Sequence, residues 1–292
     1  MGSLIAATLL WALSFGLIRQ HLTGLDPTFV AWARMLLALP VLLPFVRPRE
    51  LSLWPWPRGQ VAARLAGVGA VQYGLMYTGY IAAFGFAAAH EVALFTVTTP
   101  LYVCLIVDAR ERRLDVRNLG LAALAVAGAV ILQPKGLAWS DAWVGFCLVQ
   151  ASNLCFAWGQ VAYRRLRRAA PTARDHAVFA WLYAGGLAVT TAATTIAGGW
   201  ASAAQVSSTQ AAALLYLGVV ASGLGFYLWN RGAVTAPAGA LAVFNNLKIP
   251  AAVVAALTIF GERADLRRLA LGGAVMLIAA ALAARRGAPL RS

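Results

Sequence analysis

Long apolar segments, separated by short groups of polar residues, fill almost the whole chain of 292 residues. A helix needs about 20 residues to cross the hydrocarbon core of a membrane, and these segments approach that length. Outer-membrane barrels instead have strands of about ten residues with alternating polarity. The pattern therefore predicts an all-α membrane protein. Ten transmembrane helices are expected, at 3–19, 27–46, 62–84, 88–107, 116–133, 141–163, 176–197, 209–230, 237–260 and 266–284.

Two stretches of the chain repeat the same order of motifs. In each, a proline inside an apolar segment is followed by Glu-Arg and then by an Asp and an Arg. Pro100 and Pro250 lie 150 residues apart, as do Asp115 and Asp265. The repetition predicts two five-helix domains, 1–137 and 138–292. Because five is an odd number, the second domain would enter the membrane upside down, which makes the repeat an inverted one.

Composition and charge narrow the class of protein further. Hydrophobic residues make up 61% of the chain and charged residues only 12%, which excludes a soluble domain of this size. The net charge of +14 would favour nucleic acid in a soluble protein, but here the basic residues lie between apolar segments. With the N-terminus in the cytoplasm, 17 basic residues fall on the cytoplasmic side and five on the other. The positive-inside rule thus predicts that both termini are cytoplasmic, and no nucleic-acid partner is expected.

Lys248 is the most conspicuous candidate for a binding residue. It lies well inside the ninth predicted helix, where a charge costs several kcal/mol unless it faces water or a partner. Asn245 lies three residues earlier, on the same helical face, so the two could hold a carboxylate. Alternatively, the lysine reaches the membrane interface or binds carbonyl groups that Pro250 leaves without a donor. Pro100 and Pro250 are predicted hinges, with static kinks as the alternative.

A second polar group begins the fourth predicted helix, at His90 and Glu91. Arg34 of the second predicted helix is a candidate ion-pair partner for Glu91, with substrate binding as the alternative role for Arg34. Glu91 could instead carry a proton for coupled transport or contact an amine of the substrate.

Aromatic and amide side chains occur together in the middle of several predicted helices. Tyr73, Tyr77 and Tyr80 lie along one side of the third, Asn153 and Trp158 lie in the sixth, and Tyr227 lies in the eighth. Such a mixture favours a wide, partly apolar cavity for organic substrates. Packing in the protein core is the alternative for each aromatic residue.

Several short motifs resemble the EamA-type branch of the drug/metabolite transporter superfamily. They are Trp11-Ala12-Leu13-Ser14-Phe15-Gly16, Phe29 with Arg34, and the two segments in which proline precedes Glu-Arg. The chain is most similar to the bacterial amino-acid exporters of that branch, in particular those for aromatic amino acids. This resemblance implies ten helices in two inverted repeats around a cavity lined by helices 1, 3, 4, 6, 8 and 9. Carried onto this chain, it implies a substrate site at Tyr73, Tyr77, His90, Glu91, Phe95, Asn153, Trp158, Tyr227, Asn245 and Lys248.

These patterns together predict an inner-membrane exporter of amino acids and related metabolites that works by alternating access. A multidrug exporter for cations is the nearest alternative, followed by a channel. An enzyme is not expected, because the sequence lacks a Gly-x-Ser-x-Gly elbow and an HExxH motif. We expect a monomer that contacts membrane lipid and its small-molecule substrate, with no cofactor and no bound metal.

Overall fold

The computed structural model describes residues 2–110, 139–235, 248–249 and 251–286, with scattered positions between 112 and 131. Throughout this part of the chain the regular structure is helical, and it contains no strand. Five helical segments within it are long and apolar enough to cross a membrane: Gly2–Leu22, Pro27–Phe45, Ala89–Arg110, Asp175–Ala197 and Ser208–Val234. The predicted all-α class is therefore confirmed, while the count of ten helices and the inverted repeat stay predictions.

The described helices of the first half begin close to where the apolar pattern predicts them. They are α1 (Gly2–Ala12), α2 (Ser14–Leu17), α3 (Pro27–Leu42), α4 (Arg58–Gly69), α5 (Met76–Ala83), α6 (Ala89–Phe95) and α7 (Thr99–Arg110). The start of α3 follows from local chemistry, because the Asp26 carboxylate accepts hydrogen bonds from the backbone N–H groups of Thr28 and Phe29 at 2.9 and 3.2 Å. Pro27 then occupies the first helical position, where no N–H group is needed.

The described helices of the second half are α9 (Trp139–Arg168), α10 (Asp175–Val178), α11 (Ala180–Ala197), α12 (Ser208–Leu215), α13 (Gly225–Thr235) and α15 (Leu266–Arg286). Helix α11 ends at Gly198, whose φ of 71° is a left-handed conformation that glycine adopts without strain. Ser207 caps α12 by accepting a hydrogen bond from the N–H of Gln210 at 3.3 Å. Most of the fifth predicted helix and half of the ninth lie outside the described residues.

Three of the predicted transmembrane helices, the first, third and eighth, contain π-helical stretches. These are Ile18–Leu22, Ala70–Leu75 and Tyr216–Leu224. Within the last of them, the Ser222 hydroxyl donates to the carbonyl of Leu217 at 2.6 Å. Such stretches rotate the side chains that follow them and are frequent at functional sites.

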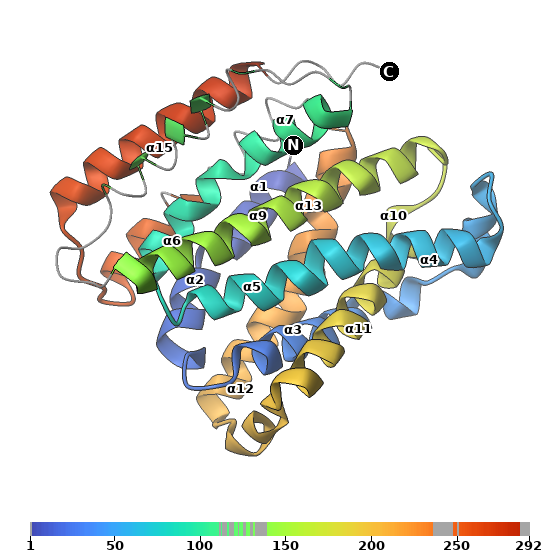
Figure 1. The fold of residues 1–292 in the computed structure, drawn as a ribbon. Helices are drawn as coiled ribbons and strands as arrows, with labels where there is room; N and C mark the ends of the chain where they lie inside the picture. Colours follow the sequence, from blue (N-terminus) through green and yellow to red (C-terminus); the bar gives the residue numbers. More distant parts are fainter. Residues whose placement is uncertain are drawn as a thin grey trace.

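Close helix contacts hold the centre of the bundle together. Helix α9 packs between α5 and α7, and α11 packs on α3 and α4 (Figure 1). Gly69 and Gly185 make the approach of α4 and α11 possible, since a Cβ atom on either would lie 1.8 Å from a backbone carbonyl oxygen of the other helix. Small residues serve this purpose in membrane bundles, where apolar surfaces gain little by leaving lipid.

Candidate functional site

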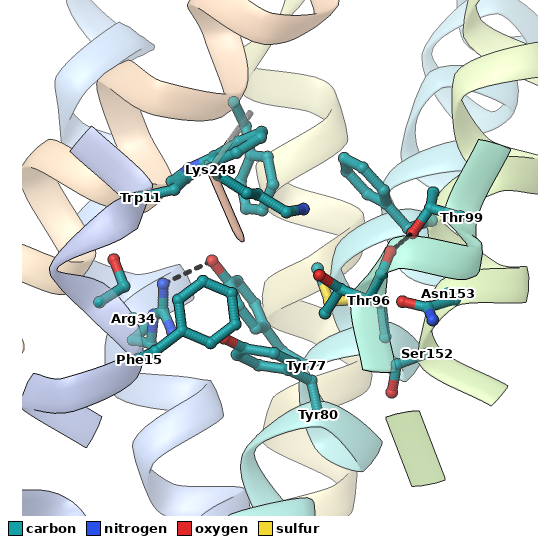
Figure 2. A pocket seen from close by; sticks show the side chains of 14 residues that line it. Trp11, Phe15, Arg34, Tyr77, Tyr80, Thr96, Thr99, Ser152, Asn153 and Lys248 are labelled. Atoms are coloured by element: carbon teal, nitrogen blue, oxygen red, sulfur yellow. Dashed lines mark hydrogen bonds between the residues drawn. The ribbon is translucent and has the colours of Figure 1, made fainter. Parts of the chain in front are cut away.

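A cavity lies in the middle of the bundle, where seven of the ten predicted transmembrane helices meet (Figure 2). Its empty volume is about 540 Å³, including space open to solvent. Six of the seven are the helices that the resemblance implies, namely 1, 3, 4, 6, 8 and 9. The seventh is the second predicted helix, α3. The lining residues are Trp11, Ser14, Phe15, Arg34, Met76, Tyr77, Tyr80, Thr96, Thr99, Ser152, Asn153, Phe156, Phe226 and Lys248.

A break in the fourth predicted helix, which is the crossing segment Ala89–Arg110, forms one wall of this cavity. Residues Thr96–Thr98 form a short 3₁₀ turn between α6 and α7, just before Pro100. The Phe95 carbonyl, at the break, accepts hydrogen bonds from the side-chain amides of Gln150 at 3.2 Å and Asn153 at 2.9 Å, both on α9. The break is therefore held open by side chains of α9, and it turns Thr96 and Thr99 toward the cavity.

Arg34 forms the opposite wall and is held by two neighbours. Its Nη2 donates to the Tyr77 hydroxyl at 2.7 Å, and its Nε donates to the Ser222 hydroxyl at 3.2 Å. The guanidinium also lies over the Tyr77 ring, 4.1 Å from the ring centroid. Because the single hydrogen of Ser222 is donated to a backbone carbonyl, Tyr77 donates to Ser222 at 3.0 Å. The suggested pair of Arg34 with Glu91 is therefore wrong.

The cavity is cationic. Lys248 is buried against it, with its amine 5.4 Å from the centroid of the Trp11 ring. Figure 2 shows the side chain of Lys248 above Tyr77 and reaching into the cavity. Among the described residues, no Asp or Glu lines this cavity. Two buried cations, with no carboxylate among the described lining residues, make the site suited to an anion.

Two buried donors at the cavity have no hydrogen-bond partner among the described residues. They are the Nη1 group of Arg34 and the hydroxyl of Ser14. Arg34 is only 2% exposed and Ser14 only 4%. A buried donor without a partner costs about 1–3 kcal/mol, more when it is charged. Both donors are thus placed to gain from a ligand that supplies acceptor oxygens.

His90 and Glu91 border a different cavity, formed by the π-helical stretch Ile18–Leu22, the start of α6 and the start of α15. The Nδ1 of His90 lies 2.7 Å from a carboxylate oxygen of Glu262, 172 residues away in the sequence. The N–H groups of Ala89 and His90 also donate to Glu262, at 2.9 and 3.2 Å. Burial raises the pKa of Glu262, but these three hydrogen bonds outweigh it and leave the pKa below its ordinary value. Glu91 accepts from the N–H of Ala88 at 2.9 Å, which ties it to its own helix start.

Apart from His90, Glu91 and Pro100, the sequence-predicted residues divide into three groups. Tyr77, Asn153 and Lys248 meet at the central cavity, and their role in binding stays a prediction. Four others pack elsewhere in the core: Tyr73 against Asn230, Phe95 against Phe146, Tyr227 against Phe179, and Trp158 on α9. Asn245 and Pro250 lie outside the described residues.

Sequence reasoning missed several lining residues, chiefly Trp11, Phe15 and Thr99. Trp11 and Phe15 are four residues apart on one helical face, and Thr96 and Thr99 are three apart beside a proline. These spacings were signals for a shared face. Which face turned inward depended on the π-helical and 3₁₀ segments, which no periodicity revealed.

Comparison with known proteins gives relatives over nearly the whole chain. The EamA-like transporter family profile matches residues 1–133. A protein of Salmonella typhimurium named biotin transporter is 38% identical over 279 residues, which cover 95% of this chain and 90% of the relative. The Escherichia coli protein of the same name has the same identity and coverage. A protein of Pseudomonas aeruginosa named probable biotin transporter is 38% identical over 95% of both chains.

A crystal structure of a protein that is 21% identical superimposes with a TM-score of 0.63, covering 98% of this chain and 97% of its own. At that level of identity the likeness concerns the fold alone. It supports the arrangement of the helices around the cavity.

Proposed function

The chain belongs to the EamA-like transporter family, and from this premise we propose that it carries biotin across the membrane. The expected membership of the drug/metabolite transporter superfamily is confirmed, and with it a multi-pass membrane transporter. Biotin enters the proposal from the names of relatives that are 38% identical over 95% of this chain.

The observation that carries the proposal is the cationic cavity. Biotin is an anion at neutral pH, since its only ionised group is the carboxylate of its side chain. Arg34 and Lys248 both line the cavity, and the Nη1 group of Arg34 has no hydrogen-bond partner among the described residues. A carboxylate bound there would complete the hydrogen bonds of a buried guanidinium, and charge-assisted bonds of this kind are among the strongest in proteins.

The apolar walls suit the remainder of such a substrate. The rings of Trp11, Phe15 and Tyr80 border the cavity, together with Phe156 and Phe226. Aromatic walls bury a ring and an aliphatic chain without requiring further charges. An organic acid with a ring system therefore matches the lining better than a small inorganic anion.

Alternating access is the mechanism that this proposal requires, because the cavity lies near the middle of the bundle. The 3₁₀ break beside Pro100 supports a hinge in the fourth crossing segment, and Pro250 would be its counterpart in the ninth. The contact of His90 with Glu262 joins two parts of the chain on one side of the cavity and would separate when that side opens. We place the protein in a bacterial inner membrane with both termini in the cytoplasm, following the distribution of basic residues.

Amino-acid export is the second candidate, and the resemblance to amino-acid exporters supports it. A zwitterion also offers a carboxylate to Arg34 and Lys248. Its ammonium group, however, would enter a cavity with two cations and no carboxylate among the described lining residues. This charge balance favours an anion over a zwitterion, and it disfavours the cationic drugs of a multidrug exporter.

Counterflow in proteoliposomes tests the proposal. Vesicles loaded with unlabelled biotin should accumulate labelled biotin from outside, whereas protein-free vesicles should not. Further vesicles are loaded with phenylalanine, with another amino acid or with a cationic dye in place of biotin. They test amino-acid export and multidrug export. Exchange of amino acids without exchange of biotin would refute the biotin proposal, and conduction without saturation would indicate a channel.

A further inference from the structure

We propose that the cavity has two chemically distinct ends, one that binds the carboxylate and one that accepts hydrogen bonds from N–H groups of the substrate. The accepting end consists of Thr96, Thr99 and Asn153. This inference rests on the proposed function and adds to it how the substrate is oriented. The inference follows from which hydrogen-bonding groups of each side chain are already used within the protein.

The two threonines can only accept further hydrogen bonds. The hydroxyl of Thr96 donates to the carbonyl of Ala93 at 2.8 Å, and that of Thr99 donates to the carbonyl of Thr96 at 2.8 Å. A hydroxyl group has one hydrogen, so what remains at each oxygen is acceptor capacity. Thr96 is 5% exposed and Thr99 2% exposed, and both line the cavity.

Asn153 likewise offers only acceptor capacity to the cavity. Its Nδ2 group donates to the carbonyl of Phe95 at 2.9 Å and to the hydroxyl of Thr98 at 3.0 Å, which uses both amide hydrogens. The first of these bonds fixes the orientation of the amide, because a flipped side chain would set two carbonyl oxygens against each other. The Oδ1 atom accepts no hydrogen bond from the described residues, and Asn153 lines the cavity.

The opposite end offers donors instead. The Nη1 group of Arg34 lies at this end and has no hydrogen-bond partner among the described residues. The hydroxyl of Ser14, which also lines the cavity, likewise has none. Figure 2 shows Arg34 on one side of the cavity and Thr96, Thr99 and Asn153 on the other, with Tyr77 and Tyr80 between them. Arg34 and the three acceptors therefore lie on opposite sides of the cavity, and the figure draws the amine of Lys248 above Tyr77, between the two sides.

This separation selects a class of substrate. Biotin has a carboxylate at the end of an aliphatic chain and two ureido N–H groups at its opposite end. The carboxylate would accept from Arg34 and Ser14, while the N–H groups would donate to Thr96, Thr99 or Asn153. In an α-amino acid the carboxylate and the ammonium share one carbon atom, so this pair of groups could not serve both ends at once. Only an amino acid with a further N–H group on its side chain could do so. Specificity of this kind arises because an analogue without the N–H groups leaves buried acceptors unpaired.

The test compares biotin with two analogues as competitors in biotin counterflow. Thienylpentanoate keeps the carboxylate, the chain and a sulfur-containing ring but has no N–H group. Biotin methyl ester keeps the ureido ring but has no carboxylate. The variant Thr96→Val/Thr99→Val removes two acceptors while preserving side-chain shape. Thr190→Val is the matched control, since Thr190 is buried on α11 away from the cavity and also bonds only carbonyls of its own helix.

We expect the double valine variant to weaken the apparent affinity for biotin about tenfold or more and to leave that for thienylpentanoate unchanged. Ser14→Ala, which breaks no hydrogen bond among the described residues, should weaken binding of both acids and leave that of the ester unchanged. Equal weakening of biotin and thienylpentanoate by the double variant, or no weakening of either, would overturn the inference. An equal effect of Thr190→Val would overturn it too, because packing would then explain the loss. If the wild-type protein exchanges no biotin, the proposed function itself fails.

Discussion

Ser222 is expected to position Arg34, and replacing it with alanine should destabilise the protein measurably. Ser222 is fully buried and accepts hydrogen bonds from the Arg34 Nε at 3.2 Å and from the Tyr77 hydroxyl at 3.0 Å. Alanine removes the hydroxyl oxygen that accepts both hydrogen bonds, which leaves the two buried donors without this acceptor. The bond from a charged group is worth about 1.5–3 kcal/mol and the neutral one about 1 kcal/mol, so the free energy of unfolding should fall by about 2–4 kcal/mol.

The assay is unfolding of the purified protein in detergent, followed by circular dichroism at increasing denaturant. Ser14→Ala is the matched control, because Ser14 is also a buried serine of the cavity but its hydroxyl bonds none of the described residues. That variant should be as stable as the wild type, or slightly more stable. The reasoning is refuted if Ser222→Ala costs no more than Ser14→Ala.

Two further predictions concern contacts away from the cavity. Glu262→Gln should lower the hydrogen-exchange protection of the His90 amide, which donates to Glu262 at 3.2 Å. The pKa of Glu262 is lowered in the folded protein, so the ionised carboxylate stabilises the fold fully above the ordinary carboxyl pKa. This stabilisation should disappear as the pH falls through the lowered pKa. Protection of the His90 amide that stays constant across this pH range would contradict the prediction. Gly185→Ala should destabilise the protein by about 1–3 kcal/mol, since its Cβ would lie 1.8 Å from the Ala66 carbonyl oxygen. Gly67→Ala, with open space around its Cβ, should have no such effect, and equal melting temperatures for both variants would refute the packing argument.

The apolar pattern predicted the helices well because membrane thickness fixes their length. The segments expected at 27–46 and 176–197 correspond to crossing segments at Pro27–Phe45 and Asp175–Ala197. The same pattern could not predict how each helix is rotated about its axis. Three tyrosines of the third segment share one side by spacing, yet Tyr77 and Tyr80 line the cavity while Tyr73 bonds Asn230 at 2.5 Å. The π-helical stretch Ala70–Leu75, which contains Tyr73, separates them.

Partners distant in the sequence were the other source of error. Charge alone suggested Glu91 for Arg34, because both lie within predicted helices. Arg34 instead contacts a tyrosine and a serine, and Ser222 is 188 residues away from it. Neutral partners of a buried arginine give no signal in sequence, since hydroxyl groups are common in every helix. His90 and Glu262 are similarly 172 residues apart, and only the packed structure brings them together.

The internal repeat gains a chemical meaning from the two ends of the cavity. Thr98 and Lys248 lie 150 residues apart, at matching positions before Pro100 and Pro250. In the first copy the residues before the proline are threonines, and two of them, Thr96 and Thr99, offer only acceptors to the cavity. In the second copy the corresponding stretch contributes the amine of Lys248 to the same cavity. One duplicated helix would thus supply opposite hydrogen-bonding character from its two copies, and a substrate with a carboxylate and separate N–H groups needs both. A duplication that kept its two copies identical would lack this distinction between the ends.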